Sequence, residues 1–285
     1  MTILVTGANG GFGSVFLPLL RAHYREPVIG AGRSSKDADN YIKCDFSDAI
    51  AINSLIKSIR PSIIFHLVGS FTGGFEIDLQ INVLSARHIF ESIIAEKLKT
   101  RVIIFGSAAE YGAVLAEDNP IPESLPCKPV SFYGLTKNYQ TEMAKFYART
   151  SNIDVVIARV FNLAIAGLSP RLFYGRANAM ISAYKNNQIT QMEFGNLSSE
   201  RDYIGIEEAV TQLLAIAARG TSGEVYNVGS GVPKTMRSIL TEMLSKEGIS
   251  SDVIVETSSE SVGRKGFDVP MIYANTSKVT SILNN

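Results

Sequence analysis

A tyrosine and a lysine four residues apart, Tyr133 and Lys137, are the side chains of this sequence best suited to move a proton. On a helix this spacing places both side chains on one face. An ammonium group beside a phenol favours the phenolate, so the tyrosine becomes a usable acid or base at neutral pH. The same spacing also occurs on ordinary amphipathic helices, and the pair alone therefore only suggests a proton-transfer site.

The N-terminus carries a glycine turn between an apolar run and a helical pattern. Gly7, Gly10 and Gly13 follow the apolar residues 3–5 with the spacing G-x-x-G-x-x-G. After them, apolar side chains recur at helical spacing, at Phe16, Leu17 and Leu20. Gly7 would permit a tight turn, Gly10 the approach of a pyrophosphate to the backbone, and Gly13 close packing of helix on strand. This order predicts a dinucleotide site, with a purely structural glycine turn as the alternative.

A serine follows the apolar run 102–105, within the segment Gly106-Ser107-Ala-Ala-Glu-Tyr-Gly112. A serine just past the end of a buried strand projects into the crevice where a parallel sheet binds ligands. We expect Ser107 to hydrogen-bond a substrate oxygen, Tyr133 to transfer the proton, and Lys137 to hold the cofactor ribose and lower the tyrosine pKa. The alternative is a hydroxyl that merely caps the next turn.

These residues lie in a chain where apolar strands alternate with amphipathic helices. Further strands are predicted at residues 28–30, 63–68 and 155–160, and helices at 49–59 and 77–98. Continuous apolar strands are typical of a parallel sheet that is covered by helices on both faces. The predicted fold class is therefore α/β, a Rossmann-type doubly wound parallel sheet.

The end of the second strand bears on the choice of cofactor. An acidic residue there would hydrogen-bond a ribose 2′-hydroxyl and repel a 2′-phosphate, but this chain has Gly30-Ala-Gly-Arg33-Ser-Ser35. Arg33 and the two hydroxyls suit a 2′-phosphate, so NADP(H) is favoured and NAD(H) is possible; a solvated loop arginine is the alternative. Asp45, after a short third strand, is placed to meet the adenine amine, with a helix N-cap role as the competing interpretation.

Composition excludes several other classes of protein. The 285 residues carry 27 basic and 27 acidic side chains, a formal net charge of zero, which gives no electrostatic footprint for nucleic acid or an anionic membrane. No apolar stretch reaches the length of a membrane span, and no signal-type segment opens the chain. Two cysteines, Cys44 and Cys127, and three scattered histidines have no metal-ligand spacing. We expect a cytoplasmic protein with reduced thiols and no metal.

In combination, the motifs of this chain resemble the extended short-chain dehydrogenases/reductases of the nucleotide-sugar epimerase/dehydratase group. The motifs that carry the resemblance run nearly end to end: Thr6-Gly-Ala-Asn-Gly-Gly-Phe-Gly13, His66-Leu-Val-Gly69, Asn82-Val83, Ser107 to Gly112, Pro129 through Lys137, Arg159-Val-Phe-Asn162, Arg201-Asp-Tyr-Ile204 and Tyr226-Asn-Val-Gly229.

The resemblance implies a dinucleotide domain over residues 1–162, with 201–229 returning to it. It also implies a smaller, mostly C-terminal α/β region over 163–200 and 230–285 that grips a nucleotide-diphosphate sugar. A homodimer would form through a four-helix bundle of the helices near 79–97 and 133–149. The cofactor contacts that it implies, besides the three glycines, Arg33, Asp45, Tyr133 and Lys137, are Asn9, Phe12, Phe46, Leu67, Val68, Gly69 and Phe161.

Two alanines narrow the reaction. The sugar 4,6-dehydratases of this group carry an acid and a base directly after the catalytic hydroxyl residue, where this chain has Ala108 and Ala109. Alanine can neither protonate a leaving hydroxyl nor remove a proton, so dehydration by that mechanism is not expected. Glu110 comes one residue later, and its direction stays open at this point.

The segment from Gly106 to Gly112 resembles the GDP-4-keto-6-deoxymannose reductases of the group, as does Gly263-Arg-Lys-Gly-Phe-Asp-Val-Pro270. This similarity implies hydride delivery from NADPH to a 4-keto sugar, or to a related deoxyheptose, in surface-polysaccharide biosynthesis. The alternatives are a 4-epimerase with tightly bound NAD and a non-catalytic dinucleotide-binding protein. The loop Leu163–Pro170 departs from the usual Gly-Pro-Gly, which leaves the identity of the sugar open.

For the substrate we select side chains that suit a diphosphate and a sugar ring. Arginine forks match phosphate oxygens and keep their charge at any physiological pH. The candidates, each of which has a surface or packing role as its alternative, are Asn162, Arg171, Arg176, Arg201, Arg264 and Phe71.

Overall fold

The centre of the molecule is a parallel β-sheet of seven strands. The computed structural model describes residues 1–34, 40–257 and 269–283. The strands of this sheet are β1 (Ile3–Thr6), β2 (Val28–Gly32), β3 (Tyr41–Lys43), β4 (Ile63–His66), β5 (Arg101–Ser107), β6 (Asp154–Val160) and β10 (Val225–Val228). Their order is β10-β6-β5-β4-β1-β2-β3, with every neighbouring pair parallel. The predicted doubly wound sheet is confirmed.

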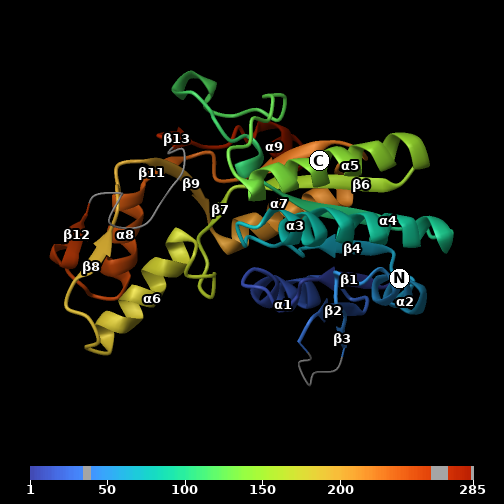
Figure 1. The fold of residues 1–285 in the computed structure, drawn as a ribbon, viewed down its shortest axis with the longest axis horizontal. Coiled ribbons are helices and arrows are strands. Elements are labelled where there is room, and N and C mark those ends of the chain that lie inside the picture. Colours follow the sequence, from blue (N-terminus) through green and yellow to red (C-terminus); the bar gives the residue numbers. More distant parts are fainter. Residues whose placement is uncertain (35–39, 258–268, 284–285) are drawn as a thin grey trace.

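Helices cover both faces of this sheet (Figure 1). One layer holds α1 (Gly13–His23), α7 (Ile206–Arg219) and α9 (Ser277–Leu283), and the other holds α2 (Ala49–Ile59), α4 (Ser85–Ala95) and α5 (Phe132–Ser151). Successive strand residues point to opposite layers, as Ile3 and Val5 do relative to Leu4. The continuous apolar runs in the sequence follow from burial on both faces.

The helix predicted over residues 77–98 is interrupted. It consists of α3 (Phe75–Asp78), a π-helical turn (Leu79–Leu84) and then α4. A π-turn inserts extra backbone into a helix and is often found beside functional sites. Here it carries the buried side chains of Asn82 and Val83, which lie behind the loop that follows β4.

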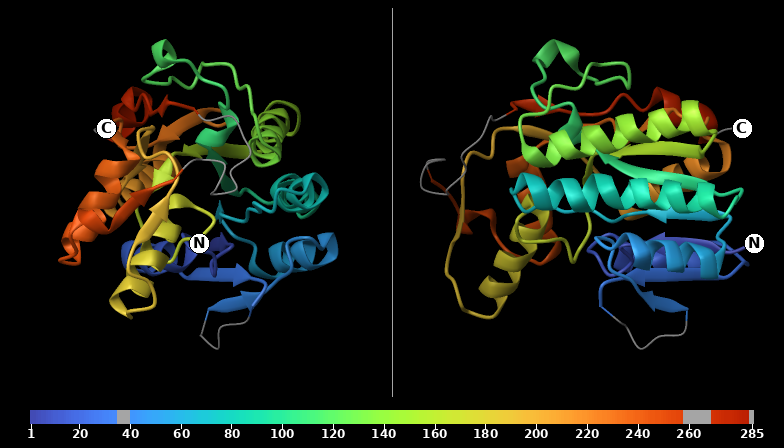
Figure 2. Two further views of the ribbon diagram at one scale, coloured as in Figure 1. Left: turned by 60° about the vertical axis from the view of Figure 1, so that its left-hand side comes forward. Right: turned by 45° about the vertical axis from the view of Figure 1, so that its right-hand side comes forward.

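The smaller region lies beside one end of the sheet, as the views in Figures 1 and 2 show. It contains α6 (Phe173–Lys185), α8 (Met236–Lys246) and six short strands, β7 (Asn162–Leu163), β8 (Met192–Phe194), β9 (Glu200–Ile204), β11 (Pro233–Thr235), β12 (Ile254–Glu256) and β13 (Met271–Ile272). Phe173, Phe194 and Leu240 belong to its separate apolar core. The chain reaches this region at β7, and α7 and β10 return to the large sheet.

The strand order fixes where a ligand can bind. From β1 the chain winds through β2 to β3 on one side and from β4 to β6 on the other, so the direction reverses between β1 and β4. In such sheets ligands bind beyond the carboxyl ends of the strands at this reversal. The glycine turn after β1 and the segment after β4 both lie there.

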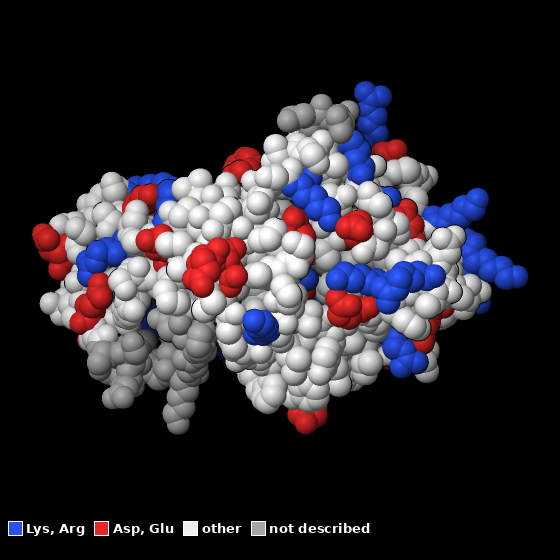
Figure 3. Space-filling model, turned by 90° about the horizontal axis from the view of Figure 1, so that it is seen from above, with Lys and Arg blue, Asp and Glu red and all other residues white. Residues whose placement is uncertain are grey.

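Charge on the surface is mixed. On the face seen in Figure 3, lysine and arginine side chains lie interspersed with acidic ones. Among the residues described, no helix combines the length and the apolar character that crossing a bilayer requires.

Candidate active site

Ser107 and Tyr133 meet because α5 begins directly beside the turn that ends β5. The Ser131 side chain caps α5 by accepting from the Gly134 backbone N–H at 3.1 Å. A Cβ on Gly134 would lie 2.3 Å from the Ala109 carbonyl oxygen, closer than real Cβ atoms approach. Glycine at 134 therefore lets the first turn of α5 pack on the Ser107 turn.

Burial keeps Tyr133 protonated. Desolvation raises the pKa of its phenol above 10, and the Ser107 hydroxyl, which lies near enough to hydrogen-bond it, acts in the opposite direction. The Lys137 ammonium donates to Gln140 Oε1 at 2.7 Å and is not among the groups that shift the Tyr133 pKa, so its lowering of that pKa stays a prediction. A neutral phenol is the form that gives a proton to a developing alkoxide.

Lys137 itself is buried, and burial lowers its pKa to about 8. Its side chain lies close enough to His66 to help depress the pKa of that imidazole. Lys137 therefore lies on the same side of the sheet end as β4, although α5 supplies it.

Ser107 also performs the capping role that was its alternative. Its Oγ accepts from the Ala109 backbone N–H at 3.2 Å, at the start of a short 3₁₀ turn (Ala108–Glu110). A hydroxyl that accepts this bond keeps its own proton for another acceptor. Capping and substrate binding are thus compatible at Ser107.

Glu110 points away from the candidate site into the protein. Its Oε1 accepts from the Ser107 N–H at 2.7 Å, and its Oε2 accepts from Arg159 Nη2 at 2.8 Å and from Thr141 Oγ1 at 2.8 Å. Both charged side chains of the pair are buried, at 0% and 2% exposed. The open direction of Glu110 is thereby decided: it anchors the Ser107 turn.

His66 is a fully buried residue at the end of β4. The Ser85 hydroxyl donates to the Ile81 carbonyl at 2.6 Å, so Ser85 Oγ is left to accept from His66 Nε2 at 3.1 Å. His66 Nδ1 then accepts from Thr6 Oγ1 at 2.8 Å. Burial lowers the pKa of His66 to about 3, so the ring is neutral and joins β1, β4 and the π-turn. The sequence signal for this role of His66 is a polar residue within the apolar run 63–68.

Asn82 fixes the loop that follows β4. Its Oδ1 accepts from the Ser70 N–H at 2.7 Å, while its Nδ2 donates to the Ser70 carbonyl at 3.0 Å and to Thr136 Oγ1 at 2.9 Å. One buried amide therefore ties the β4 loop to α5, the helix that carries Tyr133 and Lys137.

The glycine turn has the geometry of a phosphate cradle. Gly7 has a positive φ of +69°, and a Cβ there would lie 2.9 Å from the Val68 backbone nitrogen. A Cβ on Gly13 would lie 2.3 Å from the Gly7 carbonyl oxygen, and one on Gly10 would lie 3.2 Å from it. Side chains would thus fill the space that the turn leaves beside its backbone. The residues present fit a dinucleotide pyrophosphate.

Asn9 and Phe12 extend this turn in two directions. Asn9 Nδ2 donates to both the carbonyl and the hydroxyl oxygen of Ser34 at 2.7 Å, and its buried Oδ1 has no partner among the described residues. The Phe12 ring packs on Phe16 and Phe105, with centroids 5.0 and 5.5 Å away. Asn9 therefore connects the pyrophosphate turn to the end of β2.

The residues expected around the adenosine lie at the ends of β2 and β3. Arg33 is exposed and lies near Asp45. The pKa of Asp45 is lowered mainly by hydrogen bonds from the Ser47 N–H and hydroxyl, and the charge of Arg33 adds to this effect. The competing N-cap role for Asp45 is wrong, because Asp48 caps α2 by accepting from the Ile50 N–H at 2.8 Å. Asp45 instead holds the turn at Ser47.

The remaining expected cofactor residues are buried or lie beside the turn. Leu67, Val68 and Gly69 follow β4, and the Val68 backbone nitrogen would lie 2.9 Å from a Cβ on Gly7. Phe46 packs edge-on to His66 at 6.3 Å, and Phe161 packs on Tyr111 at 6.3 Å between β6 and β7. These two aromatic rings belong to apolar cores, which is the role the structure displays for them.

Phe71 and Arg171 meet beside Tyr133. The Phe71 ring stands edge-on to the Tyr133 ring at 5.2 Å and is 47% exposed. Arg171, from the segment between β7 and α6, donates from Nη1 to the Phe71 carbonyl at 3.0 Å. A segment of the smaller region therefore reaches the loop after β4 across the sheet end.

The other candidate substrate residues are distributed within the smaller region. Asn162 Nδ2 donates to the Asp202 carbonyl at 3.0 Å, Arg201 Nη1 to the Glu200 carbonyl at 2.8 Å, and Arg176 Nη2 to the Glu193 carbonyl at 3.0 Å. Asn162 and Arg201 lie on the adjacent parallel strands β7 and β9. Arg264 lies outside the described residues.

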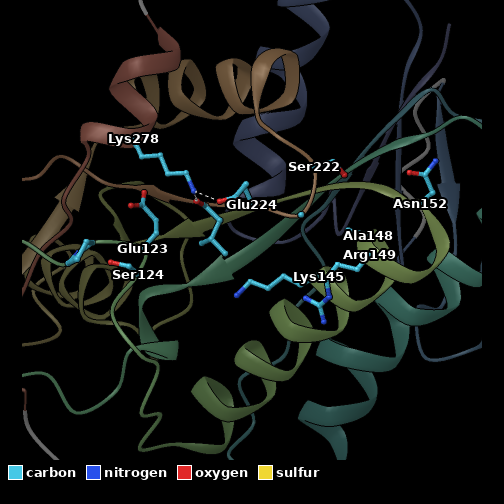
Figure 4. Close-up of a pocket in the computed structure, with 12 residues that line it drawn as sticks. Glu123, Ser124, Lys145, Ala148, Arg149, Asn152, Ser222, Glu224 and Lys278 are labelled. Carbon is cyan, nitrogen blue, oxygen red and sulfur yellow. Dashed lines mark hydrogen bonds and ion pairs between the residues drawn. The ribbon is translucent and has the colours of Figure 1, made fainter.

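A separate open cleft of about 780 Å³ lies at the opposite edge of the sheet (Figure 4). Lys145 and Arg149 line it from the C-terminal half of α5, and Glu224 pairs there with Lys278 at 2.8 Å. Val225, at the start of β10, also lines it. This is the amino edge of the sheet, whereas ligands of doubly wound sheets bind at the carboxyl edge. Among the described residues, no group of three metal-ligating side chains assembles anywhere.

The chain is similar to known proteins. Residues 3–229 match the NAD dependent epimerase/dehydratase family. The chain is 25% identical to a GDP-6-deoxy-D-talose 4-dehydrogenase of Aggregatibacter actinomycetemcomitans, over 100% of this chain and 92% of that protein. It is 26% identical to a GDP-6-deoxy-D-mannose reductase of Pseudomonas aeruginosa, over 57% of this chain and 54% of that protein. The solved structure of RMD from Pseudomonas aeruginosa complexed with NADPH superposes with a TM-score of 0.85 at 20% identity, covering 99% and 92% of the two chains.

Proposed function

The chain belongs to the NAD dependent epimerase/dehydratase family, and from this premise we propose that it reduces the 4-keto group of a nucleotide-activated 4-keto-6-deoxy sugar with NADPH. The observation that carries the proposal is the composition of the Ser107 turn. Ser107 faces Tyr133 beside the cradle, Ala108 and Ala109 offer no acid or base, and Glu110 is paired with Arg159. A site with one proton donor fits reduction and lacks the groups for elimination of water.

The roles of the residues follow from this geometry. Ser107 donates its free hydroxyl proton in a hydrogen bond to the carbonyl oxygen, and Tyr133 transfers its phenolic proton to the same oxygen as it becomes an alkoxide. When bound at the glycine turn, NADPH supplies the hydride that the carbonyl carbon accepts. The ketone thus gains a hydride and a proton, and becomes a secondary alcohol. Lys137 keeps positive charge beside the tyrosinate that this transfer leaves.

Three arguments support NADP(H) over NAD(H). The end of β2 carries Arg33 in place of an acid, and a guanidinium attracts a 2′-phosphate. A net reductase must also exchange its cofactor at each turnover, whereas an epimerase returns the hydride to its substrate. The solved structure of RMD from Pseudomonas aeruginosa, which has the same fold, is complexed with NADPH.

For the sugar nucleotide, we propose a GDP-linked substrate bound between Tyr133 and the smaller region. Phe71 would contact the apolar face of the deoxy sugar, and Asn162, Arg171 and Arg201 would lie toward the diphosphate, with Arg176 and Arg264 as further candidates. The names of two relatives, both of which act on GDP-6-deoxy sugars, support this choice. The division into a dinucleotide domain (1–162 with 201–229) and a sugar-nucleotide region remains part of the proposal, as does a cytoplasmic location.

We also propose a homodimer through α4 and α5. Phe146 and Tyr139 lie seven residues apart on α5 and are 52% and 44% exposed, while Ile94 on α4 is 43% exposed. Tyr147 and Phe90 join the two helices at 5.1 Å, so these apolar side chains lie on neighbouring helices. Exposed apolar side chains on paired helices are typical of a helix-bundle interface.

The test is a spectrophotometric assay with purified protein, NADPH and GDP-4-keto-6-deoxymannose. We expect loss of the nicotinamide absorbance, and a fall in kcat of about 10²–10⁴-fold in Tyr133→Phe. Tyr139→Phe, on the same helix but exposed, is the matched control and should keep full activity. If the protein oxidises NADPH with none of the nucleotide-linked 4-keto sugars offered to it, the proposal is refuted. Turnover without added reductant, by protein that copurifies with NAD, would identify a 4-epimerase instead.

A further inference from the structure

The phenol of Tyr41 lies across β2 in a slot made by two glycines. Tyr41 pairs with Gly30 in the register of β2 and β3. A Cβ on Gly30 would lie 2.9 Å from both Tyr41 Cδ2 and Leu17 Cδ2, so the ring fills the space between β2 and α1. Gly32, two residues on and on the same side of the strand, leaves room for the end of the same ring.

The Tyr41 hydroxyl occupies the place of a side chain at the last residue of β2. A Cβ on Gly32 would lie 2.3 Å from Tyr41 Oη and 3.7 Å from Asn9 Nδ2. This is the position at which an acidic side chain would hydrogen-bond a ribose 2′-hydroxyl. An aspartate at Gly32 would have to displace the phenol, so Tyr41 occupies the space of the group that would repel a 2′-phosphate.

The hydroxyl groups around this position are available as donors. Tyr41 Oη is buried and has no hydrogen-bond partner among the described residues. Ser34 Oγ accepts from Asn9 Nδ2, which leaves the Ser34 proton free to bond another acceptor. Burial raises the pKa of Tyr41, so its hydroxyl keeps its proton at physiological pH. Buried polar groups are normally paired, and the unpaired Tyr41 hydroxyl beside the cradle is a donor for an acceptor atom of a ligand.

We propose that Tyr41 is a specificity-determining residue for the cofactor, which blocks an acid at Gly32 and donates a hydrogen bond to the 2′-phosphate of NADP(H) together with Ser34 and Arg33. The inference rests on the proposed preference for NADPH and deepens it. Arg33 supplies positive charge for the 2′-phosphate. Tyr41, on the neighbouring strand, occupies the place of an acidic side chain at Gly32 and supplies a hydroxyl that donates to the phosphate. A phosphate oxygen would provide the partner that Tyr41 Oη lacks.

The first test is cofactor binding, which requires no sugar substrate. NADPH, NADH and adenosine 2′,5′-bisphosphate are titrated into wild-type protein and Tyr41→Phe by calorimetry. We expect Tyr41→Phe to weaken NADPH and the bisphosphate by about tenfold, the effect of one hydrogen bond to a charged group, with NADH unchanged. Tyr24→Phe, at the far end of α1, is the matched control and should bind all three like the wild type.

The second test exchanges the phenol for a carboxylate. Gly32→Asp alone should gain no affinity for NADH, because the phenol holds the space the carboxylate needs. Gly32→Asp combined with Tyr41→Leu, which keeps apolar packing on Leu17, should bind NADH more tightly than NADPH. Thermal melts of both variants establish that they are folded.

The outcomes distinguish the role of Tyr41 from the proposed preference for NADPH. Equal wild-type affinity for NADPH and NADH would refute the cofactor preference and the role of Tyr41 together. A wild-type preference for NADPH that Tyr41→Phe leaves unchanged would overturn the role of Tyr41 alone, as would tight NADH binding by Gly32→Asp with Tyr41 in place. Each of these readings is independent of whether any sugar is reduced.

Discussion

Replacing Glu110 with glutamine tests the assignment of this buried carboxylate to structure. The variant Glu110→Gln keeps an acceptor for the Ser107 N–H but removes the charge that Arg159 Nη2 meets at 2.8 Å. Arg159 is 1% exposed, so its guanidinium would stay buried without a charged partner. We expect a large loss of stability.

The magnitude follows from the burial of the pair. Removing one partner of a buried ion pair costs about 3–5 kcal/mol of unfolding free energy, because the other charge is left uncompensated. For a chain of this length, each kcal/mol lowers Tm by about 2 °C. The expected fall in Tm is therefore about 6–10 °C.

The assay is thermal and urea unfolding followed by circular dichroism, with Glu91→Gln as the matched control. Glu91 pairs with Arg87 at 2.8 Å, but the two side chains are 43% and 49% exposed. Such a surface pair contributes about 0.5 kcal/mol or less, so Glu91→Gln should unfold close to the wild type. If Glu110→Gln unfolded with the wild type and lost only turnover, Glu110 would be a catalytic group and the present assignment would be wrong.

Three further predictions concern pH, charge burial and assembly. The pKa of His66 is about 3 in the folded state against 6.5 in the unfolded chain, so only the unfolded state takes up this proton as pH falls below 6.5. The unfolding free energy should therefore fall by about 1.4 kcal/mol per pH unit more in the wild type than in His66→Asn. Equal slopes of the two proteins in urea titrations at several pH values would show that the ring is not neutral and buried. The pKa of Lys137 is about 8 in the folded state against 10.5 in the unfolded chain, so the unfolded chain takes up this proton first as pH falls from 10.5 to 8, and stability falls over that range. At pH ~7 the full burial cost is present, so Lys137→Met should melt higher than the wild type while losing turnover. A lower Tm would contradict the burial cost. Phe146→Glu should convert the proposed dimer to a monomer, measured by light scattering after size exclusion. Leu115→Glu, at an exposed position (61%) away from α4 and α5, is the control and should stay dimeric. If Phe146→Glu also stays dimeric, the interface lies elsewhere.

The sheet and its glycine turn could be predicted because local patterns determine them. Apolar residues 3–5 and 102–105 give strands buried on both faces, and the spacing of Gly7, Gly10 and Gly13 gives the turn between β1 and α1. The sequence also predicts Ser107 and Tyr133 at element ends that a parallel sheet brings to one edge, and their joint role in proton transfer stays a prediction.

What the sequence did not reveal depends on contacts between distant segments. The direction of Glu110 is set by Arg159 on the neighbouring strand, 49 residues away. The π-turn is invisible to helical periodicity, and the buried bonds of Asn82 and His66 involve partners up to 60 residues apart. Tyr41 has no signal in the sequence, because only the register of β2 and β3 brings its hydroxyl to Gly32.

The most direct measurement of the central claim follows the hydrogen that is transferred. GDP-4-keto-6-deoxymannose is incubated with the enzyme and NADPH that carries deuterium at its transferable position, and the product sugar is analysed by mass spectrometry and NMR. We predict one deuterium per product molecule, located at C4, with one NADPH oxidised for each sugar formed. A product without deuterium, or conversion of a nucleotide sugar with no net oxidation of NADPH, would contradict reduction by this site.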